Sequence, residues 1–190
     1  MAFKAYRGVR YIKGLVNSEK HHTDFSIGGT SPNTTPSTQQ LTAIAQGDEI
    51  DDRTGNSIFV RGITWRFCLE LHASATATQV RMVLVKDNQQ GADSAPSWTT
   101  VFSSAAIDSL LNIQTLGRFT ILKDKTYLLD AVNRRQIFEK GFYPMKYHVR
   151  FNGTTSSDIQ KNGLYLMYMS NEATNTPTLD GVWRTNFYDN

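Results

Sequence analysis

The sequence predicts a single all-β domain, a sandwich or barrel, with a short basic segment at its amino end. About seven or eight stretches alternate between apolar and polar residues or are apolar throughout, and polar turns separate most of them. Beyond the first segment, no stretch repeats apolar residues with the period of a long helix. With 190 residues, 39% of them apolar, the chain is long enough to bury one sizeable core.

The clearest strands come in two kinds. Residues 63–72 and 145–152 alternate between apolar and polar side chains, which predicts strands with one buried face. Residues 80–85 and 164–169 are almost wholly apolar, which predicts strands buried on both faces near the middle of a sheet. Further strands are expected over residues 119–122, 127–132 and 182–188, the first two separated by a polar break at 123–125.

Three segments depart from this pattern. Residues 3–18 have the spacing of an amphipathic helix, and residues 28–40, rich in Gly, Ser, Thr, Asn and Pro, have the composition of a linker. Residues 97–112 predict a short helix or an irregular insertion. We therefore divide the chain into a basic amphipathic arm over 1–23, a linker with a first edge strand over 24–45, and the β domain over 46–190.

The excess positive charge lies at one end of the chain. The net charge is +3, but residues 1–22 alone carry +4, from five basic residues and one acidic residue. The basic residues are Lys4, Arg7, Arg10, Lys13 and Lys20. The first four recur every three residues, so they share one half of the helix surface. This asymmetry indicates an arm that binds a polyanion such as nucleic acid, and the alternative is a solvated helix that packs its apolar side on the body.

The sequence lacks the marks of an enzyme, a secreted protein or a membrane protein. It has no Gly-rich phosphate loop, HExxH or GxSxG motif, and its four His residues have no partner His at metal-ligand spacing. Cys68 is the single cysteine, so no intrachain disulfide is expected. No apolar run approaches the ~18 residues of a membrane helix, and no apolar signal segment follows the basic start.

Two charged clusters in the β domain allow two interpretations each. Residues 48–52 contain four carboxylates, which fit either a tight polar turn or a site for a hard cation such as Ca²⁺. Lys146, His148 and Arg150 share the polar face of one predicted strand. They suit either a nucleic-acid face or pairing with acidic residues of a neighbouring subunit.

Four segments of the chain have distinctive sequences. Residues 46–55 read QGDEIDDRTG, and residues 118–124 read RFTILKD. Residues 81–89 read RMVLVKDNQ and are followed by Pro96, and residues 13–19 read KGLVNSE. Together they resemble the coat proteins of satellite tobacco necrosis virus and of the circular, Rep-encoding single-stranded DNA viruses, which share that coat type. The resemblance covers roughly residues 40–190.

This resemblance implies a viral capsid protein with an eight-stranded jelly roll. About sixty copies would assemble into a small T=1 icosahedral shell around single-stranded nucleic acid, DNA rather than RNA by this resemblance. The arm would face the interior and bind phosphates. A charge of +4 per arm is small for a genome, so the interior wall is expected to contribute through residues such as Arg118, Lys123 and Lys146.

The same resemblance implies Ca²⁺ at the interfaces between subunits. Carried over by position, the ligands would be Glu19, Asp48 and Asp189. Carboxylates crowded at a symmetry axis repel one another, and a divalent ion would cancel that repulsion. The protein is then expected to assemble inside the host cell, to reside in the virion and to meet a host receptor of unknown identity.

The rival interpretation is a jelly-roll binding module, either lectin-like or a trimeric receptor ligand. It accounts for the β pattern and the aromatic content equally well, but not for a basic arm joined by a linker rich in Gly and Thr. A jelly-roll enzyme such as a cupin would need a set of His and Glu ligands that the chain lacks. The sequence therefore favours a capsid protein without enzymatic activity.

Overall fold

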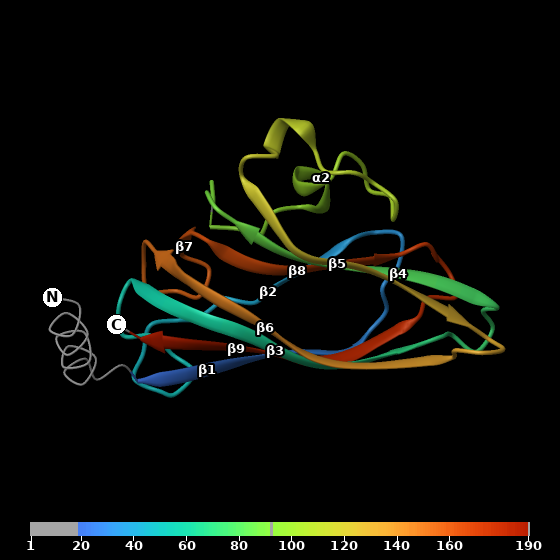
Figure 1. Cartoon of the computed structure of the whole chain (residues 1–190), viewed down its shortest axis with the longest axis horizontal. Coiled ribbons are helices and arrows are strands. Elements are labelled where there is room, and N and C mark those ends of the chain that lie inside the picture. Colours follow the sequence, from blue (N-terminus) through green and yellow to red (C-terminus); the bar gives the residue numbers. More distant parts are fainter. Residues whose placement is uncertain (1–18, 92, 190) are drawn as a thin grey trace, which may run out of the picture.

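The described part of the chain forms two antiparallel β-sheets, with an irregular insertion between β4 and β5 (Figure 1). The computed structural model describes residues 19–91 and 93–189, and the predicted arm helix with Lys4, Arg7, Arg10 and Lys13 lies outside them. In chain order the elements are β1 (Lys20–Thr30), β2 (Ser37–Gln40), β3 (Ser57–Glu70), β4 (Ala77–Asp87), α2 (Trp98–Val101), η1 (Ile113–Thr115), β5 (Phe119–Asp130), β6 (Gln136–Phe151), β7 (Ile159–Lys161), β8 (Gly163–Ser170) and β9 (Thr178–Asp189). Within these ranges, none of the helices has the length and apolar character needed to cross a bilayer.

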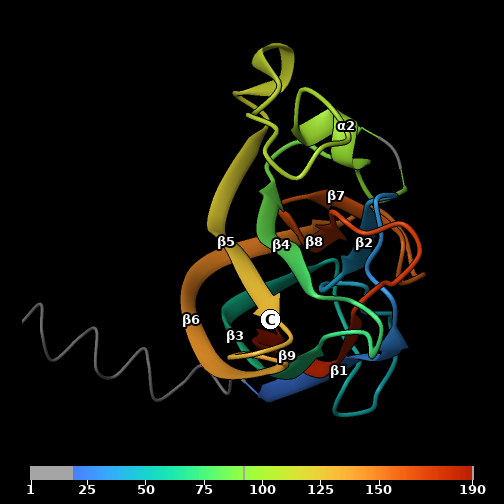
Figure 2. The same ribbon diagram turned by 90° about the vertical axis from the view of Figure 1, so that its right-hand side faces the viewer.

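Most consecutive strands lie in different sheets. One sheet has five strands in the order β1-β9-β3-β6-β7, and the other has four in the order β2-β8-β4-β5. Each pair of neighbouring strands is antiparallel. The two sheets curl and face each other (Figure 2). The described part of the chain is mostly β, as the sequence predicts.

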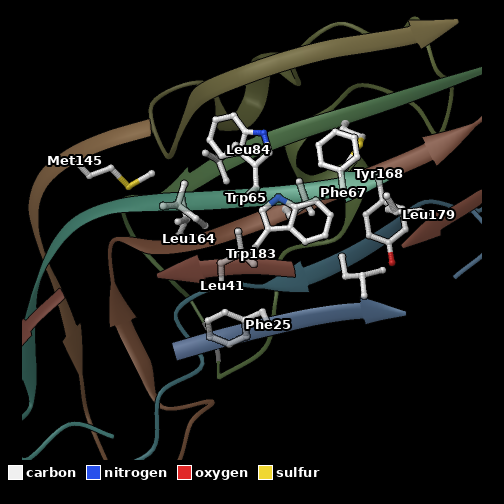
Figure 3. Close-up of a cluster of buried hydrophobic side chains, with 14 of the residues drawn as sticks. Phe25, Leu41, Trp65, Phe67, Leu84, Met145, Leu164, Tyr168, Leu179 and Trp183 are labelled. Carbon is white, nitrogen blue, oxygen red and sulfur yellow. The ribbon is translucent and has the colours of Figure 1, made fainter. Parts of the chain in front are cut away.

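Apolar side chains from both sheets fill the space between them (Figure 3). Trp65, Phe67 and Leu69 occupy alternate positions of β3 and all point into this core, as the predicted strand over 63–72 requires. The ring of Phe67 stacks on Trp183 of β9 at 5.5 Å between centroids and meets Tyr127 of β5 edge-on at 5.7 Å. Ring pairs of these two geometries stabilise a core beyond the area they bury.

A second apolar core covers the outer side of the four-stranded sheet. Trp98, Val101 and Phe102 of the insertion between β4 and β5 pack there against side chains of β4, β5 and β8. Strands β4 and β8 are therefore buried on both faces, which confirms the prediction from the apolar runs at 80–85 and 164–169.

The polar residues 123–125 do not interrupt a strand, contrary to the prediction. Strand β5 runs continuously from Phe119 to Asp130. The charges of the three residues pair with Glu139 of β6 and with Arg81 of β4. A charged residue is tolerated in a strand when its partner lies on a nearby strand, here β4 of the same sheet or β6 of the facing sheet, so charge alone did not mark a turn.

The predicted linker over 28–40 contains the end of β1 and all of β2. Strand β1 begins at Lys20, inside the segment assigned to the arm, and buries Phe25 and Ile27. Two apolar residues among Ser, Thr and Gly are a weak strand signal. Strand β2 has no apolar residue, and its main chain pairs with β8. The structure therefore has two edge strands, β1 and β2, where the sequence predicted a linker with one edge strand.

Candidate nucleic-acid interface

The outer face of the five-stranded sheet gathers basic side chains from all five of its strands. Alternate residues of each strand point into the core, and the others point outward. The outward positions hold eight basic residues and three acidic ones, a net charge of +5 on what we call the basic face. The basic residues are Lys20, Arg61, Arg66, Lys140, Lys146, Arg150, Lys161 and Arg184, and the acidic ones are Asp24, Glu70 and Asp180.

Two cations lie side by side at the middle of the basic face. Arg66 of β3 and Lys140 of β6 are directly opposite each other in the register. They line an open hollow of about 690 Å³ together with Thr64, Val182 and Arg184. Like charges opposite each other on neighbouring strands destabilise a sheet by about 0.2–1 kcal/mol. Their pairing is therefore better suited to binding an anion than to holding the fold together.

Exposed aromatic rings flank these cations. Phe138 and Phe142 of β6 lie on either side of Lys140 along the outward face and are 76% and 55% exposed. Farther along the face, the guanidinium of Arg61 lies over the ring of Tyr188 at 5.2 Å. Grooves that bind single-stranded nucleic acid combine cations for the backbone with aromatic rings on which bases stack. The basic face has both.

Few carboxylates oppose the positive charge of this face. Asp24 of β1 pairs with Arg184 of β9 through two hydrogen bonds of 2.6 and 2.7 Å. The hydrogen bond from Arg184 holds the pKa of Asp24 below its usual value, so the carboxylate stays charged. That pair is neutral as a unit, and seven basic residues then face two carboxylates across the rest of the surface. A surface with one sign of charge raises the local concentration of a polyanion.

Lys146 and Lys20, both predicted to bind nucleic acid, lie on the basic face. Arg118 and Lys123, the other predicted residues that the structure describes, do not. Lys146 shares the outward side of β6 with Lys140, and Lys20 lies at the start of β1. Arg118 precedes β5, in the other sheet, and forms a bidentate pair with the buried Asp87 at 2.9 and 2.6 Å. That pairing raises the pKa of Arg118, so its role here is to neutralise a buried carboxylate.

Lys123 belongs to a hydrogen-bonded cluster that joins the two sheets at their edge. The carboxylate of Glu139 on β6 accepts hydrogen bonds from Lys123 at 2.8 Å, from Lys125 and from the hydroxyl of Tyr127 at 2.7 Å. Burial raises the pKa of Glu139, but these three hydrogen bonds outweigh it and lower the pKa to about 2. Lys123 also lies over the ring of Trp65 at 4.2 Å. The cluster therefore stabilises the fold and does not contribute to the basic face.

We expect Glu139→Gln to lower the Tm by a few degrees at neutral pH, since it leaves two lysines without their counter-charge. Folding depresses the pKa of Glu139 from 4.5 to about 2, so its contribution is complete above pH 4.5 and is lost as the pH falls toward 2. Thermal melts of the two proteins at pH 7, 4 and 2 should converge with falling pH. A difference in Tm that stays constant over this range would show that the charge of Glu139 is not responsible.

The three residues named for calcium lie at one end of the sandwich. Glu19 precedes β1, and its carboxylate is 3.5 Å from His21. Asp48 is exposed in the loop before β3. Asp189, at the end of β9, is buried and accepts hydrogen bonds from the backbone N–H, at 2.6 Å, and the hydroxyl of Thr54. Over residues 19–91 and 93–189, no three His, Cys, Asp or Glu side chains are grouped to hold a metal ion.

Five basic-face residues were not singled out from the sequence. They are Arg61, Arg66, Lys140, Lys161 and Arg184. Strand alternation marks Arg66 as pointing outward, but only the pairing of β3 with β6 and β9 brings it beside Lys140 and Val182. Finding these residues requires the order of the strands in the sheet. The alternation of residues along a single strand does not reveal that order.

Comparison with solved structures finds distant likenesses. The dimeric latent PorU of Porphyromonas gingivalis matches with a TM-score of 0.45 and 8% identity over 92% of this chain, and this chain covers only 13% of that protein. Desmodium yellow mottle tymovirus matches with a TM-score of 0.40 and 13% identity, covering 92% of this chain and 89% of that one. The empty head of turnip yellow mosaic virus gives 0.41 and 12%, covering 92% and 82%.

Comparison with known sequences is decisive. None of the curated proteins matches the chain. The family model described as the satellite tobacco necrosis virus coat protein matches residues 5–189, nearly the whole chain. The chain therefore belongs to the satellite tobacco necrosis virus coat protein family, whose members are structural components of a virion.

Proposed function

We propose that the chain is the subunit of a small icosahedral capsid, a T=1 shell of about sixty copies that encloses single-stranded nucleic acid. Membership in the coat protein family supports self-assembly and packaging. The strand orders β1-β9-β3-β6 and β2-β8-β4-β5 support an eight-stranded jelly roll, with β7 as a short addition. Assembly takes place inside the host cell, where subunits and genome meet.

The observation that carries this proposal is the separation of surfaces on the two sheets. The outer side of the five-stranded sheet is the basic face, with exposed phenylalanines, whereas an apolar insertion covers the outer side of the four-stranded sheet. We infer that the basic face lines the interior of the shell. In about sixty copies, the arm at +4, with Lys20 included, supplies about 240 positive charges, and the rest of the basic face, at +4 without Lys20, adds about 240 more. The face then contributes as much to neutralising the genome as the arm does.

The arm acts together with this face. Lys4, Arg7, Arg10 and Lys13 precede Lys20, which is both the last cation of the arm segment and the first of the basic face. Contacts to phosphates carry no sequence information, so binding is expected to be largely independent of sequence. The stacking rings favour a single strand over a duplex. DNA is the cargo that the sequence resemblance favours.

Electron microscopy and light scattering of the purified protein test this function. We expect uniform closed particles that contain nucleic acid. A protein that stays a monomer of 21.4 kDa under all conditions of salt and calcium would overturn the proposal.

We also propose that Ca²⁺ binds between subunits, with Glu19, Asp48 and Asp189 as its carboxylates. The support is that all three lie at one end of the sandwich and that Asp48 is exposed on its surface. The ion would offset the repulsion between these carboxylates and so tighten the contact.

We expect a chelator to lower the Tm of the assembled particle by a few degrees, and added Ca²⁺ to restore it. Asp48→Asn particles should melt at the same temperature with and without chelator. A Tm of the unaltered particle that does not respond to chelator would remove calcium from the account.

A further inference from the structure

A second hollow lies on the basic face beside the Arg66–Lys140 pair. It has a volume of about 510 Å³, and its walls include both cations together with Cys68, Phe138 and Asp180. The first hollow, by contrast, has no carboxylate in its lining. A hollow of this size that combines an apolar ring with a few polar groups is typical of a site for a small ligand.

The strand register places three of these side chains in one row across the sheet. Cys68 of β3 is directly opposite Phe138 of β6 on one side and Asp180 of β9 on the other. All three side chains point outward. Neighbouring strands are about 4.8 Å apart, so the main chains that carry the ring and the carboxylate are about 10 Å apart. The small thiol is therefore the floor of a gap that accommodates one flat heterocycle.

The two cations lie in the next row along the strands. Arg66 and Lys140 are each two residues away from Cys68 and Phe138, respectively, which is about 7 Å along a strand. They are therefore within reach of the phosphate of a nucleotide whose base occupies the gap. The hollow offers a ring for the base, a carboxylate for its edge and cations for the phosphate.

Asp180 is available to a ligand. It forms neither an ion pair nor a side-chain hydrogen bond with any other residue that the structure describes, whereas Asp24 on the same face pairs with Arg184. Burial and the charges of Glu70 and Asp180 raise the pKa of the Cys68 thiol, so the carboxylate acts close to the floor of the gap. An unpaired carboxylate weakens the attraction of a surface for phosphates. Asp180 is better suited to a group that donates hydrogen bonds.

Guanine is the base whose edge fits this carboxylate. Its Watson–Crick edge presents two adjacent donors, N1–H and the N2 amino group, and the two oxygens of a carboxylate accept both. Thymine has a single N–H between two carbonyl oxygens, which a carboxylate repels. Cytosine and adenine each have one amino group beside an unprotonated ring nitrogen, so they offer one donor and one clashing acceptor.

We propose that the second hollow is a guanine-selective subsite of the basic face; the inference rests on the proposed packaging of single-stranded nucleic acid. The base packs on Phe138 and donates hydrogen bonds to Asp180, and its phosphate binds Arg66 and Lys140. Contacts elsewhere on the face go to phosphates and carry no sequence information. The subsite therefore adds a preference at one nucleotide per subunit to binding that is otherwise independent of sequence.

The first test varies the base at constant charge. It compares three fluorescent DNA strands of equal length: oligothymidylate, and the same strand with guanine or inosine at every third position. We expect the full-length protein to bind the guanine strand about fivefold more tightly than oligothymidylate. The inosine strand, which lacks the N2 amino group, should lie in between. Equal affinities for all three strands would overturn the subsite alone, whereas a protein that binds none of them would contradict the proposed function.

The second test removes the carboxylate. Asp180→Asn should abolish the preference for guanine and should tighten the binding of oligothymidylate, because the face loses a negative charge. The matched control is Glu70→Gln, which removes an exposed carboxylate of the same face outside the hollow. That control should tighten the binding of both strands equally. An Asp180→Asn protein that retains the preference for guanine would overturn the inference.

The third test needs no variant. Cys68 is the single cysteine of the chain, so its alkylation by N-ethylmaleimide reports on the floor of the hollow. At saturation, the guanine strand should slow this reaction several-fold, and oligothymidylate should slow it less. A rate that the guanine strand leaves unchanged, or that both strands slow equally, would overturn the inference.

Discussion

Arg53→Met is expected to lower the free energy of unfolding by about 3–5 kcal/mol, because each buried carbonyl that loses its donor costs about 1–3 kcal/mol. The side chain of Arg53 is fully buried, at 0% exposure, in the loop between β2 and β3. Its guanidinium donates hydrogen bonds to the carbonyls of Ile44, Gly55 and Gly153 at 3.0, 2.6 and 2.6 Å. It also lies over the ring of Phe151 at 3.9 Å.

Arg53 thereby joins two loops that are far apart in sequence. Methionine fills a similar volume but donates no hydrogen bond, so the loop over 41–56 would separate from the loop that follows β6. Chemical denaturation of unassembled protein measures the loss. The control is Arg61→Met, whose guanidinium is exposed and lies over the ring of Tyr188. We expect that control to change stability by less than about 0.5 kcal/mol. A loss below about 1 kcal/mol for Arg53→Met would contradict its role as an anchor.

Arg66→Gln/Lys140→Gln is expected to reduce the nucleic acid packaged per particle without weakening the fold. The two cations are directly opposite each other across β3 and β6, and their mutual repulsion is removed by the change. Loss of two phosphate contacts should make the plot of log affinity against log salt shallower by about 1.4 for a single strand. The Tm of the protein should stay the same or rise slightly.

Titration of a fluorescent single-stranded oligonucleotide at several salt concentrations, together with the absorbance ratio of particles, measures both effects. The matched control is Arg134→Gln/Arg135→Gln, which removes two exposed cations from the turn between β5 and β6, outside the basic face. That control should keep the salt slope of the unaltered protein. Equal losses in the two variants would mean that net charge, and not the basic face, determines binding.

The sequence predicted those strands whose residues have a clear burial pattern. Residues 63–72 alternate because one side of β3 faces the core and the other faces solvent. The runs at 80–85 and 164–169 are apolar throughout because β4 and β8 are buried on both faces. One face lies in the main core, and the other is covered by the second core under the insertion. The sequence placed an edge strand somewhere within residues 24–45 but did not locate β2, because β2 is held by main-chain pairing with β8 and contains no apolar side chain that would mark it.

The candidate site was predicted only in part, for a related reason. Lys146 lies on the basic face as expected, since alternation alone determines its direction. Arg118 and Lys123 could not be assigned from the sequence because their partners, Asp87 and Glu139, are brought to them by pairing between strands. Arg53 looked like part of a polar turn, and nothing in the residues beside it signals that the loop folds over its side chain.

A three-dimensional reconstruction of the purified particles by cryo-electron microscopy tests the central claim most directly. We predict a closed shell in which Arg66 and Lys140 face the lumen beside density for nucleic acid. A shell with the five-stranded sheet turned to the outside, or a preparation without closed shells, would contradict the account.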